Sequence, residues 1–195
     1  MTMTDFDIIS RLLMEDRSIR RFDASRPIGQ DVTERLVGLT RYCASGRNLQ
    51  PLRYRIVNTP EECAKVYPLL AWAGYLTDWD GPVPAERPVA YLLQCLDLRL
   101  AKDCLCDDGL QLQAITLGAR ALGIGCCILK AFDPLKVAAA LGIDTTAFMP
   151  RYIVALGYPV EKVEIEDIRD NDYKYYRTAD AVHHVPKRTL SELLI

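Results

Sequence analysis

Two short polar segments decide the interpretation of this sequence: Arg17-Ser18-Ile19-Arg20-Arg21-Phe22 and Ala44-Ser45-Gly46-Arg47-Asn48-Leu49-Gln50-Pro51. Each follows an expected helix and combines cations, small hydroxyls or amides at close spacing. Guanidinium groups bind phosphate in a forked, bidentate way, and glycine lets the backbone approach a ligand closely. The mixture suits a ligand with an anionic end and a flat polar heterocycle. Taken alone, the first segment also fits an exposed basic loop, and the second fits an ordinary helix-to-strand turn.

Length and composition favour a single domain, residues 1–195. A chain of this size buries roughly 70% of the surface that it exposes when unfolded. Lys plus Arg is 24 and Asp plus Glu is 26, so the basic surface typical of nucleic-acid binding is not expected. No apolar run reaches the ~18 residues of a spanning helix, and residues 1–16 lack the basic and apolar regions of a signal peptide. We therefore expect a cytoplasmic protein with neither a nucleic-acid nor a membrane partner.

The seven cysteines are an odd number, which favours free thiols in a reducing compartment. Cys104, Cys106, Cys126 and Cys127 would allow a metal site, but structural zinc sites usually place two to four residues between paired cysteines. Cys126 and Cys127 lie in an expected buried strand, where neighbouring side chains point to opposite faces. We interpret them as core thiols and expect no metal site.

The chain has only two histidines, His183 and His184, which are adjacent and lie near its end. In a charged tail such a pair is typical of a surface or an interface. The alternative is a pH switch or a pair of ligands.

Hydrophobic periodicity predicts helices and strands that interleave along the chain. Helices are expected at residues 6–14, at 32–43 after a cap at Asp31, after Thr59 with Pro60 in the first turn, at 108–122, and from Asp133-Pro134 to Leu141. Strands are expected at residues 54–57, 89–96, 124–129 and 151–156. The residues after Pro159 show no core pattern, so we expect an irregular tail that packs on a partner subunit. The class is α/β or α+β.

The order and spacing of the motifs resemble the nitroreductase family over nearly all 195 residues. The resemblance includes R-S-x-R at residues 17–20, S-x-x-N-x-Q-P at 45–51, Gly109-Leu110-Gln111 through Leu122-Gly123-Ile124-Gly125, Ala155-Leu156-Gly157-Tyr158-Pro159, and Pro186-Lys187-Arg188-Thr189-Leu190. It implies an α+β fold with three α/β/α layers, in which helices flank a central, mostly antiparallel mixed sheet. It also implies a homodimer, with residues 160–195 as a C-terminal arm around the partner.

The resemblance further implies an FMN cofactor and the residues that bind it. Arg17, Ser18 and Arg20 would hold the phosphate and the pyrimidine edge, and Ser45, Asn48 and Gln50 would approach from the partner subunit. The turn after the expected strand, at Leu129, Lys130 and Ala131, would bring backbone N–H groups toward flavin N5 and O4. Lys187 and Arg188 would close on the phosphate. The family usually has a basic residue where Asp16 stands, which implies one phosphate contact fewer and weaker flavin binding. A second departure is Ala44, where the family often has a proline.

The implied function is that of an FMN-dependent oxidoreductase, which passes reducing equivalents from NAD(P)H to an electron-poor aromatic acceptor, a nitroaromatic or a quinone, by a ping-pong mechanism. FMN would carry the chemistry, so no catalytic side chain is expected. Trp72, Tyr75 and Trp79 would either cover the flavin or serve as core or interface aromatics. Two alternatives remain: a flavin-binding or flavin-storage protein without a dedicated substrate, and a reductive dehalogenase or flavin-degrading enzyme of the same fold.

Overall fold

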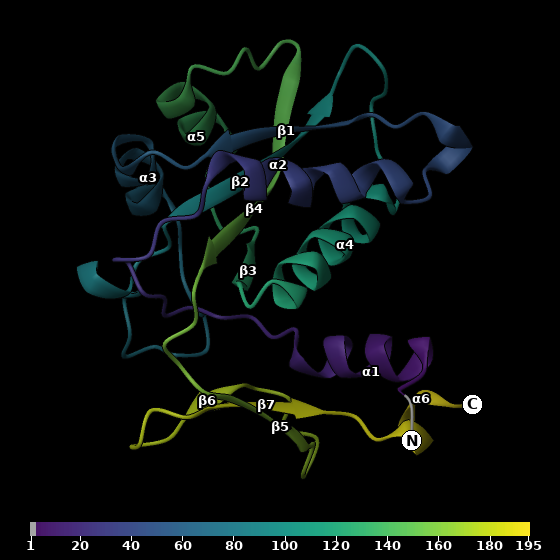
Figure 1. Ribbon diagram of the computed structural model, residues 1–195, viewed down its shortest axis with the longest axis vertical. Helices are drawn as coiled ribbons and strands as arrows, with labels where there is room; N and C mark the ends of the chain where they lie inside the picture. Colours follow the sequence, from purple (N-terminus) through teal and green to yellow (C-terminus); the bar gives the residue numbers. More distant parts are fainter. Residues whose placement is uncertain (1–2) are drawn as a thin grey trace.

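A four-stranded antiparallel sheet forms the centre of the computed structural model, which describes residues 3–195 (Figure 1). Its strand order is β1-β2-β4-β3. The strands are β1 (Leu52–Val57), β2 (Ala90–Asp97), β3 (Gly125–Leu129) and β4 (Phe148–Gly157). All eight residues of β2 are buried, which explains the continuous apolar run that predicts this strand.

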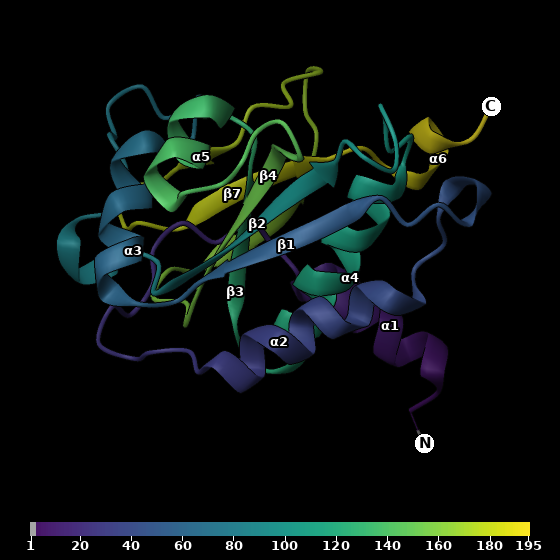
Figure 2. The ribbon, with the colours of Figure 1, turned by 90° about the horizontal axis from the view of Figure 1, so that it is seen from above.

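Helices cover both faces of this sheet (Figure 2). One face carries α2 (Gln30–Leu39) and α4 (Asp107–Ala121), and the other carries α3 (Pro60–Val66) and α5 (Pro134–Leu141). Each face has its own core cluster, and β3 supplies both: Cys126 packs with Leu36 and Ile115, whereas Cys127 packs in the other cluster. The predicted three-layer fold is confirmed, as is the burial of Cys126 and Cys127 on opposite faces.

Several helix ends follow the predicted local signals. The Thr59 side chain accepts a hydrogen bond from the Glu62 N–H, and Asp133 caps α5 by accepting from the N–H groups of Leu135 and Lys136. The predicted cap at Asp31 is wrong, because α2 begins at Gln30 with Gly29 in the N-cap position, two residues before Asp31. Short 3-10 turns complete this part: Thr40–Tyr42, Gly46–Asn48, Tyr67–Leu69 and Pro84–Glu86.

The first helix, α1 (Asp5–Glu15), buries none of its residues. It begins with a capping box between Thr4 and Asp7, and the ion pair of Glu15 with Arg120 ties its end to α4. Its apolar side chains nevertheless face outward: Phe6 is 76% exposed, and Ile9 and Met14 are exposed as well. A helix rarely exposes an apolar face to water alone, so this face of α1 is suited to contact with another molecule.

The residues after Pro159 form a second sheet, so the prediction of an irregular tail is wrong. Its strands are β5 (Val163–Asp167), β6 (Tyr176–Arg177) and β7 (His183–Lys187), in the order β5-β7-β6, and α6 (Leu190–Leu193) follows. In Figure 1 this sheet lies below α1, away from the central sheet. The prediction of a mixed central sheet is therefore wrong in one respect. The four central strands pair only in antiparallel fashion, and the parallel pairing is that of β5 with β7 in the second sheet.

Across residues 3–195, no helix is both long enough and apolar enough to cross a membrane.

Candidate functional site

The first polar segment lies along the edge strand of the central sheet. Ser18 forms a parallel bridge with Cys126 of β3, and the Ile19 N–H donates to the Cys126 carbonyl at 2.7 Å. Phe22, which is fully buried, forms an antiparallel bridge with Pro159. These backbone contacts fix the extended course of residues 17–22 between the central sheet and the C-terminal sheet.

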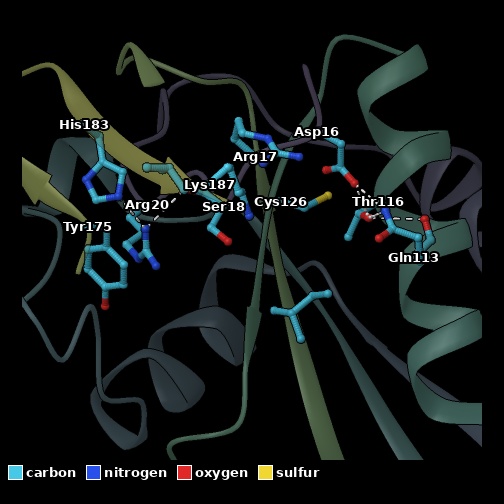
Figure 3. A pocket seen from close by; sticks show the side chains of 12 residues that line it. Asp16, Arg17, Ser18, Arg20, Gln113, Thr116, Cys126, Tyr175, His183 and Lys187 are labelled. Carbon is cyan, nitrogen blue, oxygen red and sulfur yellow. Dashed lines mark hydrogen bonds between the residues drawn. The ribbon is translucent and has the colours of Figure 1, made fainter. Parts of the chain in front are cut away.

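A cavity of about 230 Å³ opens beside this segment (Figure 3). Its walls come from the segment itself, from α4, from β3 and from the C-terminal sheet. The lining residues are Asp16, Arg17, Ser18, Arg20, Gln113, Thr116, Cys126, Ile128, Tyr175, His183, Val185 and Lys187. The fold thus brings both ends of the chain to one cavity, with three cationic side chains against one carboxylate.

Two cations of the cavity have donors that no protein atom satisfies. The Nε atoms of Arg17 and Arg20 are buried and have no hydrogen-bond partner among the described residues. Arg17 also donates from Nη2 to the Leu13 carbonyl at 2.7 Å, which anchors its side chain to α1. The Nε atoms of Arg87, Arg151 and Arg177, which do not line this cavity, are unpaired as well, so the charge of the lining is the stronger indication of a ligand. The donor set, with the Ser18 hydroxyl and Lys187, fits an anionic ligand.

Asp16 lies at the wall of the cavity that α4 forms. Its Oδ2 accepts hydrogen bonds from Thr116 Oγ1 at 2.6 Å and from Gln113 Nε2 at 2.8 Å (Figure 3). The carboxylate is therefore satisfied within the protein. The polar groups at this wall, a carboxylate, an amide and a hydroxyl, suit hydroxyl groups of a ligand better than a second anion.

His183 and Tyr175 form the third wall, which the family motifs did not predict. Tyr175 lies 4.7 Å below the guanidinium carbon of Arg20, and the His183 ring lies 5.2 Å from the Tyr175 ring. The expectation of a surface or interface histidine is wrong for His183, which is 1% exposed. Burial, helped by the cations Arg20 and Arg177, lowers the pKa of His183 to about 4. Its imidazole is therefore neutral at pH 7.

The second polar segment does not reach this cavity within one chain. Ser45 Oγ donates to Asp107 Oδ2 at 2.6 Å at the start of α4, and it accepts from the Gln50 N–H at 2.8 Å. The Gln50 side-chain amide donates to Asn48 Oδ1 at 3.1 Å. Arg47, Asn48 and Gln50 adopt positive φ angles, so the segment is an irregular turn whose polar atoms lie on the surface of the chain.

The remaining predicted site residues also lie outside the cavity lining. Leu129 is buried in the core, and Lys130 donates from Nζ to the Arg151 carbonyl at 2.8 Å. The Ala131 carbonyl accepts from the Ala71 N–H, and Arg188 forms an ion pair with Glu192 at 3.1 Å.

The aromatic residues of the 72–79 stretch have other neighbours than the cavity. Trp72 is a core residue, Tyr75 packs on Tyr175 at 4.9 Å between ring centroids, and Trp79 lies 4.7 Å from the guanidinium carbon of Arg177. Tyr75 therefore packs on a residue that lines the cavity, and Trp79 packs on a residue that does not.

Known proteins with similar sequences or structures indicate the fold family of this chain. No family model matches the chain. A Burkholderia lata protein with the provisional name NADH dehydrogenase/NAD(P)H nitroreductase is 26% identical over 175 residues, covering 81% of this chain and 89% of its own length. A solved structure from Desulfovibrio desulfuricans, provisionally described as a nitroreductase in complex with FMN, covers 98% of this chain and 97% of its own, at 20% identity and a TM-score of 0.68.

A third similar protein is a Staphylococcus epidermidis structure, provisionally described as an NAD(P)H:FMN oxidoreductase. It covers 87% of this chain and 93% of its own, at 18% identity and a TM-score of 0.66. These matches extend over most of the proteins compared and confirm the resemblance drawn from the sequence motifs. The chain has the nitroreductase fold and is related in sequence to proteins that carry an NAD(P)H nitroreductase name.

Proposed function

We propose that this protein is an FMN-dependent oxidoreductase, which takes reducing equivalents from NAD(P)H and passes them to an electron-poor aromatic acceptor, a nitroaromatic or a quinone. The observation that carries the proposal is the cavity beside residues 17–20, where Arg17, Arg20 and Lys187 gather around the Ser18 hydroxyl. Two of these cations have buried N–H donors without a protein partner. The FMN named for the Desulfovibrio desulfuricans structure supports the same ligand.

The residues of this chain would bind and orient the cofactor. Arg17, Ser18 and Lys187 offer charge-assisted and hydroxyl contacts to a phosphate, and Arg20 offers a cation to the flavin ring system. When bound, FMN supplies the electron and hydride transfer, so the protein contributes position and electrostatics rather than a nucleophile. One flavin face would serve the donor and the acceptor in turn, which gives a ping-pong cycle.

The proposal includes a homodimer with FMN at the interface. A ligand of this size usually occupies a pocket of roughly 300–1,000 Å³, whereas the cavity of one chain measures about 230 Å³. The exposed apolar side chains of α1 and α6 offer a surface for the partner; they include Phe6, Ile9, Leu190 and Leu193. In the dimer, Ser45, Asn48 and Gln50 of the partner subunit, together with Leu129, Lys130, Ala131 and Arg188, would complete the site. The seven free cysteines favour a reducing compartment, the cytoplasm.

Light scattering of paired variants tests the dimer. Phe6→Glu puts a carboxylate on the exposed apolar surface of α1, and Arg11→Glu, at a position that pairs with Glu15, puts one at a polar position of the same helix as the control. We expect Phe6→Glu to give monomers and to release FMN, and Arg11→Glu to remain a dimer. A monomeric wild-type protein that still holds FMN would contradict this part of the proposal.

The visible absorption spectrum tests the cofactor, and steady-state turnover tests the reaction. We expect flavin bands in the purified or FMN-reconstituted protein, and oxidation of NADH or NADPH that depends on the added quinone or nitroaromatic. The absence of FMN after reconstitution with excess flavin would refute the proposal. Bound FMN without turnover would favour the storage protein, and turnover only with a halogenated aromatic or with flavin itself would favour the other two enzymes.

A further inference from the structure

We infer that His183 is a positioning residue: its neutral imidazole accepts a hydrogen bond from Arg20 and holds that guanidinium in the cavity, toward the bound ligand. The identity of the ligand as FMN rests on the proposed function. The contact itself is a property of the chain, and it joins the first polar segment to β7 across 163 residues of sequence.

The hydrogen-bond chemistry fixes the role of each partner. Arg20 Nη1 lies 3.2 Å from His183 Nε2 (Figure 3). A guanidinium has only donors, so the Nε2 atom must be the acceptor. The single ring proton of the neutral imidazole is then on Nδ1, which is buried and has no hydrogen-bond partner among residues 3–195. A doubly protonated ring has no acceptor and would break the contact, so the arrangement requires the neutral form.

The surroundings of His183 maintain this neutral form. The side chain is 1% exposed, and the cations Arg20 and Arg177 lie close enough to disfavour a positive charge on the ring. His184 beside it in the chain adds a smaller contribution of the same sign. The buried Glu161 carboxylate, the acid of this cluster, is already paired with Arg177 at 3.0 Å.

Further contacts hold Arg20 from its other sides. Its guanidinium lies over the Tyr175 ring at 4.7 Å, and Nη1 also donates to the Ser18 carbonyl at 3.3 Å. Glu161 accepts from the backbone N–H of Arg20, which fixes the start of the side chain. Both side-chain hydrogen bonds use Nη1, and Nε is buried without a partner in residues 3–195. The contacts at Nη1, on the guanidinium face and at the backbone N–H together restrain a cation that lines the cavity.

Holding Arg20 in place has a defined consequence for a bound flavin. A cation fixed beside the flavin stabilises the reduced form, which carries more negative charge, and it does so without reorganising during the reaction. Without the His183 acceptor, Arg20 keeps its charge but gains rotamer freedom, so its contribution to binding and to the reduction potential falls. The alternative is that His183 only fills the core.

A double-mutant cycle separates these roles in the FMN-loaded protein. His183→Phe keeps the ring volume and removes the acceptor, and His183→Gln keeps an acceptor oxygen. We expect His183→Phe to raise the Kd for FMN by about two- to tenfold, the effect of losing one hydrogen bond, and to lower the two-electron reduction potential. His183→Gln should restore both, and His183→Phe should have no further effect in an Arg20→Ala background.

Nitrogen NMR of the wild-type protein as purified tests the contact without reference to flavin. At pH 7 we expect Nε2 of His183 to be unprotonated and Nδ1 to be protonated. A charged ring or a protonated Nε2 would overturn the inference, as would equal effects of His183→Phe with and without Arg20, or a His183→Gln protein as impaired as His183→Phe. A wild-type protein that binds no FMN would instead refute the proposed function, and the NMR result would still decide the role of His183.

Discussion

Acidification should destabilise the protein through His183, and the magnitude follows from its burial. The pKa of His183 is about 4 in the folded chain against 6.5 for the free side chain, so the unfolded chain takes up the proton first. The free energy of unfolding therefore falls as the pH drops from about 7 toward 4. From these two pKa values, the loss attributable to His183 is about 2 kcal/mol between pH 7 and pH 5, and about 3 kcal/mol once the pH is below 4.

Urea denaturation at pH 7 and pH 5, at one fixed protein concentration, measures this loss. His183→Gln is the matched protein, because its side chain has the same kind of acceptor but does not titrate. All other ionisable groups are the same in both proteins, so their contributions cancel in the difference. We expect the wild type to lose about 2 kcal/mol more than His183→Gln over this interval. Equal losses, within the ~0.5 kcal/mol of such extrapolations, would refute the reasoning that His183 is buried and neutral.

Three other predictions concern a helix cap, the thiols and the kinetics. Asp133→Ala should lower the free energy of unfolding by about 0.5–2 kcal/mol in urea denaturation, because it removes the cap of α5, whereas Asp31→Ala should cost less because Asp31 caps no helix. A small alkylating agent should modify the exposed Cys106 and spare Cys126 and Cys127, which mass spectrometry can check. Burial raises the pKa of Cys126 well above its usual value and that of Cys127 to about 11. Labelling of Cys126 or Cys127 in the folded protein would contradict this prediction. Initial rates over a matrix of NAD(P)H and acceptor concentrations should give parallel double-reciprocal lines, and intersecting lines would indicate a ternary complex.

Local signals predicted the central layers well, because there the sequence pattern and the burial coincide. Thr59 and Asp133 occupy the N-cap positions that the sequence predicts, and the apolar run of β2 is buried along its whole length. The C-terminal sheet escaped prediction because its strands are short and only half buried. In β5, charged residues alternate with Val163 and Ile165, and this short alternation alone does not show that a partner strand is present.

The candidate site was predictable in part, and the missing part has a physical reason. Arg17, Ser18, Arg20 and Lys187 follow from motif resemblance, and they line one cavity. His183 could not be found in the same way, because its burial results from pairing with Val163 and Arg177 on two neighbouring strands. A side chain that acquires its environment from long-range pairing has no local sequence signature.

The course of residues 17–22 also bears on how the protein is synthesised. This segment leaves the ribosome early, but two of the groups that hold it come late: Glu161, which accepts from the Arg20 N–H, follows 141 residues behind. The Val160 N–H, which donates to the Arg21 carbonyl, is equally late. Glu86, which accepts from the Phe22 N–H and pairs with Arg21, is translated much earlier. The end of the segment therefore finds a partner early, whereas the backbone of residues 19–21 has none until most of the chain has been translated. A ligand that needs Arg20 in place, as the proposed FMN would, is then expected to bind only after most of the chain has been translated.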